Sequence, residues 1–198
     1  MPLGGRTGGG PGESERTLSR DAHAAARVDF AHFFDYLVLA RGRLLDWTGA
    51  QPAHLYTRPY PFGLGSIRAT LIHIADIEWG YVQRLAGRDY TRAESPFTAE
   101  RYPTLPALSA AWQARRAATR AVLAALGDPS RTIEYVSRNF TPPRRTRTTA
   151  GGLAGQLLFH EVHHRAQVMT MLRLAGVPAQ DLDYSRLMWD RTSVNESD

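Results

Sequence analysis

The sequence contains no cysteine. Disulfide bonds are therefore excluded, a bound metal must be held by nitrogen and oxygen ligands, and no thiol nucleophile can come from this chain. Lysine is also absent, so all 24 basic residues are arginine, and the net charge at pH 7 is only +5. A charge excess of this size is modest, and we expect no nucleic-acid partner.

Long apolar runs are missing as well. No run reaches the roughly 18 residues that a membrane span needs, and the first residues lack the apolar stretch of a signal peptide. The sequence therefore predicts a cytoplasmic protein that makes no membrane contact.

The first residues also lack large apolar side chains. Residues 1–18 are rich in glycine, which predicts a disordered N-terminal tail. Hydrophobic residues make up 43% of the 198 positions, enough for one domain with a substantial core. We therefore expect a single helical domain over residues 19–198.

Four segments have the spacing of apolar residues that is typical of amphipathic helices. They cover residues 19–47, 66–85, 105–126 and 149–175. Ser66 is placed to cap the second segment, and Thr148 or Thr149 the fourth. Residues 131–136 and 144–149 are β-prone and favour a short hairpin. The sequence thus predicts an all-α protein, a four-helix bundle, with this hairpin before the last long helix.

Three of the seven histidines fall within five residues of the fourth segment, at His160, His163 and His164. On a helix, His160 and His164 lie about 40° apart, one turn above the other. Their face is predicted to be buried because it also carries apolar residues, namely Leu153, Leu157, Met171 and Leu174.

Two imidazoles on one buried face either find separate hydrogen-bond partners or share one cation with a ligand from another element. His73 is the candidate third ligand, because it lies on the other strongly apolar segment. The other histidines are expected to be ordinary core or surface residues, namely His23, His32 and His54.

Two rival motifs overlap the histidines. His160–His164 formally satisfies H-E-x-x-H, in which Glu161 would be the general base of a zinc protease. No histidine follows His164 as a downstream ligand, which argues against a peptidase. A di-iron site would need a second Glu-x-x-His, which the sequence lacks. Glu78 lies in the apolar stripe of its segment, either as a buried catalytic carboxylate or, as we favour, as the partner of an arginine.

Two strings resemble the signature segments of the DinB/YfiT-like superfamily. They are FGLGSIRATLIHIADIEW, residues 62–79, and LLFHEVHHRAQVMTMLRLAG, residues 157–176. The match extends over about residues 25–190 and includes Tyr36 in the first helix. Position 166 is Ala where many members have Gly.

The resemblance implies a helical bundle with a divalent ion, Zn²⁺ or Ni²⁺, bound by His73, His160 and His164. It places further residues around these ligands or in a substrate pocket, namely His163, Glu78, Trp79, Tyr36 and Gln167. Characterised members include transferases and isomerases that use small thiols, so we expect a small-molecule thiol as partner. A non-catalytic ligand-binding or partner-binding bundle and a metal-dependent hydrolase are the alternatives, and association into a homodimer is left open.

The order of the segments predicts where a substrate reaches the metal. The loop Arg58–Gly65 leads into the second helix, and the region Arg138–Arg147 leads into the fourth. These stretches mix cations and aromatic rings, which suits an anionic ligand such as a carboxylate-bearing thiol. The residues concerned are Arg58, Tyr60, Phe62, Arg138, Arg144, Arg145 and Arg147.

Overall fold

The computed structural model describes residues 28–138, 140–178 and 180–192. The expected disordered tail and His23 lie outside these residues. Within them the chain is mostly helical, as predicted, and carries one two-stranded antiparallel sheet. Its elements are α2 (Phe30–Gly49), α3 (His54–Thr57), α4 (Ile67–Leu85), the 3-10 turn η1 (Arg92–Glu94), α5 (Leu105–Gln113), α6 (Arg116–Ala124), β1 (Thr132–Ser137), β2 (Arg144–Thr149), α7 (Ala150–Leu174) and α8 (Tyr184–Met188).

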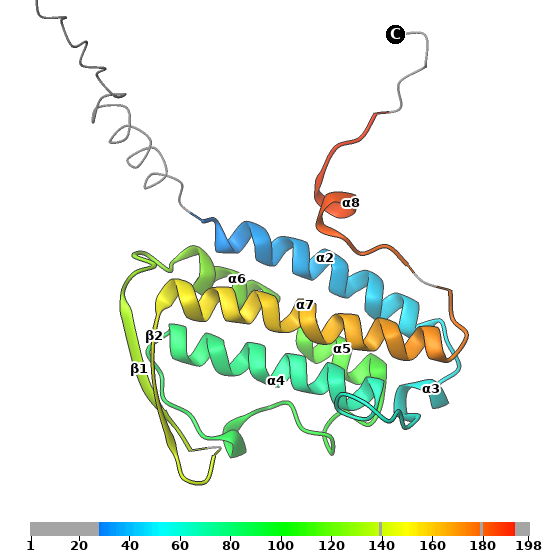
Figure 1. Ribbon diagram of the computed structural model, residues 1–198, viewed down its shortest axis with the longest axis horizontal. Helices are drawn as coiled ribbons and strands as arrows, with labels where there is room; N and C mark the ends of the chain where they lie inside the picture. Colours follow the sequence, from blue (N-terminus) through cyan, green and yellow to red (C-terminus); the bar gives the residue numbers. More distant parts are fainter. Residues whose placement is uncertain (1–27, 139, 179, 193–198) are drawn as a thin grey trace, which may run out of the picture.

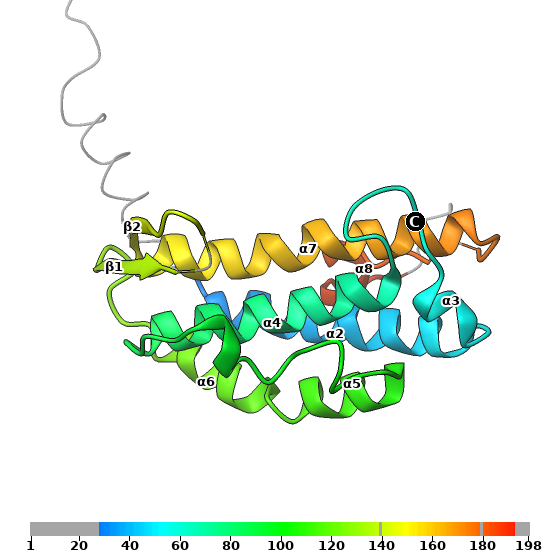
Figure 2. The ribbon, with the colours of Figure 1, turned by 90° about the horizontal axis from the view of Figure 1, so that it is seen from below.

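The long helices run side by side. Figure 1 shows α7 between α2 and α4 in projection, and Figure 2 shows α7 on one side of the α2–α4 layer and α5 with α6 on the other. In agreement, α7 packs on both α2 and α4, and α5 and α6 pack on the same two helices. The core lies between these layers and is formed by the apolar faces of the long helices.

The helix ends follow from capping side chains. Ser66 accepts a hydrogen bond from the Ala69 amide, and Thr149 accepts one from the Gly152 amide, as the sequence predicts. The helix α2 begins at Phe30, and the predicted helix start near residue 19 lies outside the described residues. Asp29 caps it by accepting from the His32 amide, so that the described residues before it are not helical.

The third predicted helix is broken in two. The prediction of one helix over 105–126 was wrong, because the chain turns at Ala114 and Arg115 between α5 and α6. Between Trp112 and Thr119 every side chain is exposed, so no buried residue anchors the middle of this alanine-rich stretch. Helix propensity alone is a weak determinant and does not keep this stretch in one continuous helix.

The β-hairpin is confirmed. β1 pairs antiparallel with β2, with Thr132 opposite Thr149, and the hairpin leads directly into α7 at one end of the helices (Figure 1). In the part of the chain that the structure describes, none of the helices combines the length and apolar character needed to cross a bilayer. The cytoplasmic location stays a prediction.

Candidate metal centre

Three histidines from two packed helices converge. His73 comes from α4, and His160 and His164 come from α7, and one ring nitrogen of each lies within 4.8 Å of the others. The Nε2 atoms of His160 and His73 are 3.1 Å apart. Two nitrogens on one tetrahedral Zn²⁺ are about 3.3 Å apart, because each Zn–N bond is about 2.0–2.1 Å long. The described residues can therefore hold one metal ion at this place with little movement.

The imidazoles lie at the edge of the core and not within it. Leu174, which the sequence places on the same buried face, is 59% exposed, and His160 and His164 are only half-buried. The buried face of α7 also carries Glu161 and Arg165, which are 2% and 5% exposed. The predicted burial of the histidine face is confirmed for Leu153, Leu157 and Met171 but not for Leu174, and the two imidazoles themselves lie half-buried beside His73 of α4. A ligand at this edge can be reached from the surface.

The surroundings of the histidines favour their neutral form. Burial lowers the pKa of His160 to about 3, and the charges of His164, His73 and His163 act in the same direction. Burial, followed by the charge of His164, also lowers the pKa of His73. Only a neutral imidazole can bind a metal ion, so the fold prepares these side chains for that role.

We expect the metal-free protein to become less stable as the pH falls below about 6.5. The unfolded chain takes up a proton on His160 near the ordinary pKa of 6.5, whereas the folded side chain stays neutral down to about 3. The unfolded state then binds more protons in this window, and the free energy of unfolding decreases. Melting temperatures of the wild type and of His160→Gln between about pH 5 and 7 test this. The variant should show the shallower slope, and equal slopes would contradict the assignment.

A glutamine fixes the orientation of one imidazole. The amide oxygen of Gln167 accepts a hydrogen bond of 2.9 Å from Nδ1 of His164, which leaves Nε2 of His164 free for a metal. The amide nitrogen of Gln167 donates to Nε2 of His163 at 3.2 Å. The sequence-predicted residues Gln167 and His163 therefore do lie beside the histidine cluster.

The loop before α4 closes over this glutamine. Gly63 has a φ of +58°, and a Cβ at this position would lie 3.0 Å from the side-chain oxygen of Gln167. A side chain at position 63 would be strained and would also press on Gln167. The loop Arg58–Gly65 thus approaches the cluster, as the sequence predicts.

The family follows from the whole sequence. A model of the DinB family matches residues 21–196, a span that includes all three histidines. The chain belongs to the DinB family. No curated protein matches the sequence significantly. The fold is consistent with this membership, because the DinB segments quoted above form α4 and α7, the two helices that carry the cluster.

Other predicted pocket residues of this DinB protein lie away from the histidines. Glu78 is buried on the opposite side of α4, where it accepts from Nη2 of Arg41 at 2.5 Å. It also accepts from the indole of Trp112 and the hydroxyl of Thr119, each at 2.9 Å. The interpretation of Glu78 as the partner of an arginine is confirmed, and its alternative as a catalytic carboxylate is not supported.

Glu161 completes the same buried network. It accepts two hydrogen bonds from Arg41, at 3.1 Å from Nε and 2.5 Å from Nη2. Burial alone would lower the pKa of the Arg41 guanidinium, but Glu161 and Glu78 outweigh it and raise this pKa. The carboxylate of Glu161 is therefore occupied in the core, where it cannot act as the general base of a zinc protease.

The two aromatic candidates are structural. The hydroxyl of Tyr36 donates to the backbone oxygen of Leu182 at 2.9 Å and accepts from Nη2 of Arg165. Tyr36 thereby joins α2 to α7 and to the chain that follows it. The ring of Trp79 packs edge-on against Tyr90, with centroids 5.0 Å apart. Neither Tyr36 nor Trp79 lines the cavity beside His73 that is described below, and their role in a substrate pocket stays a prediction.

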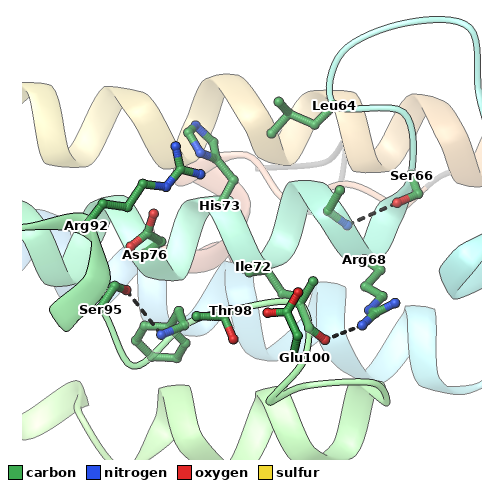
Figure 3. A pocket seen from close by; sticks show the side chains of 13 residues that line it. Leu64, Ser66, Arg68, Ile72, His73, Asp76, Arg92, Ser95, Thr98 and Glu100 are labelled. Atoms are coloured by element: carbon green, nitrogen blue, oxygen red, sulfur yellow. Dashed lines mark hydrogen bonds between the residues drawn. The ribbon is translucent and has the colours of Figure 1, made fainter. Parts of the chain in front are cut away.

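A cavity of about 520 Å³ opens next to His73. One wall is α4, and the other is the segment of residues 91–100, as Figure 3 shows. Leu64, from the loop before α4, also lines it. Four charged residues that the sequence analysis missed lie on its walls, namely Arg68, Asp76, Arg92 and Glu100. Asp76 is detectable in the sequence, because it lies one helical turn after His73 on the same face.

The hairpin arginines do not line this cavity. Arg138 pairs with Asp89, Arg147 pairs with Glu134, and the guanidinium of Arg144 lies 4.3 Å from the ring centroid of Phe140. The prediction that the hairpin flanks the opening was wrong, because its tip extends past the end of α4 that is remote from the loop Arg58–Gly65 (Figure 1). The cation beside the histidines is Arg92.

Proposed function

We propose that His73, His160 and His164 bind one divalent ion, Zn²⁺ or Ni²⁺, within a four-helix bundle in which α5 and α6 together form one member. The convergence of three ring nitrogens within 4.8 Å carries this proposal. Imidazole suits both metals, so the ligand set does not select between them. When bound, the ion supplies a Lewis acid with an open coordination position, which lowers the pKa of a thiol or water bound to it.

We further propose that the protein is a transferase or isomerase that uses a low-molecular-weight thiol. The absence of cysteine means that a reacting thiol must come from a cosubstrate, and the cavity at His73 provides space for one. Gln167 keeps His164 in the tautomer that presents Nε2, and the loop at Gly63 lies against Gln167. The chain thus supplies oriented ligands and a partly enclosed pocket.

We expect turnover of thiol and electrophile to require the metal. The metal-loaded protein is incubated with a panel of small thiols and electrophiles, and the products are detected by mass spectrometry. Chelation should abolish product formation, and Zn²⁺ or Ni²⁺ should restore it, because the Lewis acid is lost and regained. His73→Ala, which removes one ligand, serves as the inactive control.

Other results of this experiment would favour one of the alternative functions. Thiol binding without any turnover would replace the proposal by the non-catalytic binding protein. Product formation from water alone, with no thiol present, would replace it by the hydrolase. Turnover that persists after complete chelation would refute a metal-dependent reaction.

A further inference from the structure

The cavity beside His73 contains charges of both signs. Asp76 and Arg92 line it from opposite walls, Asp76 from α4 and Arg92 from η1 (Figure 3). His73 lines the same cavity and also belongs to the histidine cluster. Figure 3 shows Asp76 and Arg92 close to His73, so a small ligand in this part of the cavity can contact the metal centre and both charged side chains.

These two charges are available to a ligand. No hydrogen bond joins Arg92 or Asp76 to each other or to the other residues drawn in Figure 3. Arg68, the second arginine of the cavity, is engaged instead, because its guanidinium donates to the backbone oxygens of Tyr102 and Ala99. Arg68 therefore ties the segment 91–102 to α4 and shapes the cavity, whereas Arg92 remains free to bind an anion.

Part of the cavity wall is apolar, and it leaves room only for a short uncharged chain in the ligand. Leu64, Ala69 and Ile72 line the side toward the loop. A short aliphatic chain fits between this apolar side and the charged residues. Guanidinium groups bind carboxylates through two parallel hydrogen bonds, and a carboxylate such as Asp76 accepts from an ammonium group.

We propose that this cavity binds a zwitterionic thiol of the amino-acid type. Arg92 binds the carboxylate of the ligand, Asp76 binds its ammonium group, and the sulfur lies at the His73 end. This assignment rests on the proposed thiol-dependent function, which it makes more specific. Neither a purely anionic nor a purely cationic thiol satisfies both charged side chains, so the cavity selects a ligand with both charges.

The test uses four small thiols that differ in which charged groups they carry. Cysteine carries both charged groups, mercaptopropionate the carboxylate alone, cysteamine the ammonium alone, and mercaptoethanol neither. Their dissociation constants for the zinc-loaded protein are measured by calorimetry. We expect cysteine to bind about ten-fold more tightly than cysteamine, since a charge-assisted pair contributes about this factor. Mercaptoethanol should bind most weakly.

Two variants test the contributions of Arg92 and Asp76 one at a time. Arg92→Gln should lower the affinity for cysteine and for mercaptopropionate about ten-fold, because the carboxylate of each ligand loses its partner. The affinity for cysteamine, which has no carboxylate, should not change. Asp76→Asn should lower the affinity for cysteine and for cysteamine, whose ammonium groups lose their partner. It should not lower the affinity for mercaptopropionate. Arg101→Gln is the matched control, because Arg101 is an exposed arginine of the same segment that does not line the cavity. Zinc content is measured for each variant and should not change.

The outcomes distinguish this inference from the proposed function. Equal affinities of all four thiols, or an unchanged pattern in Arg92→Gln, would overturn the zwitterion assignment and leave a thiol-binding metal centre standing. Loss of cysteine affinity in Arg101→Gln to the same extent as in Arg92→Gln would overturn it too. If no thiol binds the zinc-loaded protein, the proposed function and this inference both fail.

Discussion

Replacing His160 with alanine is expected to abolish stoichiometric metal binding. The Nε2 atom of His160 lies 3.1 Å from that of His73, and the ring of His164 lies 4.5 Å from the ring of His160, so His160 connects the two helices at the cluster. Loss of residues that only orient a ligand typically costs 10–100-fold in affinity. Loss of a direct ligand should therefore cost more than about 100-fold, measured by metal competition with a chromophoric chelator.

His163→Ala provides the matched control. His163 lies on the same helix and is exposed. It accepts a hydrogen bond from Gln167, and its ring packs edge-on against His164 with centroids 4.8 Å apart. The two variants remove the same atoms from α7, so a difference between them reports on metal ligation and not on helix stability. We expect His163→Ala to retain stoichiometric metal. Equal metal content in the two variants, both folded by circular dichroism, would refute the ligand assignment.

Replacing Arg41 with methionine is expected to produce the largest loss of stability. Arg41 is 5% exposed, donates to both Glu78 and Glu161, and lies 3.9 Å from the ring centroid of Trp112. Methionine fills much of the same space but leaves two buried carboxylates without their ion-pair partner. Removal of one partner from a buried ion pair costs about 3–5 kcal/mol, and chemical unfolding of the metal-free protein measures it.

The loss should depend on pH in a way that identifies its cause. Burial raises the pKa of Glu161, and Arg41 opposes this shift, so in the Arg41→Met variant Glu161 takes up a proton more readily in the folded than in the unfolded chain. The folded state then binds more protons, so lowering the pH toward the ordinary range of glutamate should restore part of the lost stability. A deficit that does not shrink at acidic pH would point to lost packing and not to unpaired charge.

Arg120→Met is the control for this network. Arg120 also makes a bidentate ion pair, with Asp35, but both side chains are substantially exposed, at 49% and 37%. Solvent screens such a pair, so its removal should change stability little. A loss as large as that of Arg41→Met would mean that burial does not decide the contribution of these ion pairs.

The sequence by itself determined the features that depend on neighbours along the chain. Helix boundaries at Ser66 and Thr149 follow from side chains that cap the next backbone amides, and the hairpin follows from two β-prone stretches close in sequence. The spacing of His160 and His164 fixes their separation on any helix. The absence of cysteine excluded a whole class of ligands and nucleophiles before any fold was considered.

Only the tertiary structure decided which way each helix faces. Periodicity placed His160 and His164 on the buried face of α7, but they lie at its edge. Glu161 and Arg165 are buried more deeply, where Arg41 bonds Glu161 and Tyr36 bonds Arg165. An apolar pattern with an error of a few tens of degrees cannot distinguish the edge of a buried face from its centre.

The opening beside the histidines was also decided by the tertiary structure. Arg92 lies 19 positions after His73 in the sequence, on a short turn without helical or strand periodicity, and no local pattern relates the two. They line one cavity in which Arg68 of α4 also bonds the backbone of Ala99 and Tyr102, in the segment that follows Arg92. Contacts between a helix and an irregular segment depend on where the chain folds back, and this information is not local in the sequence.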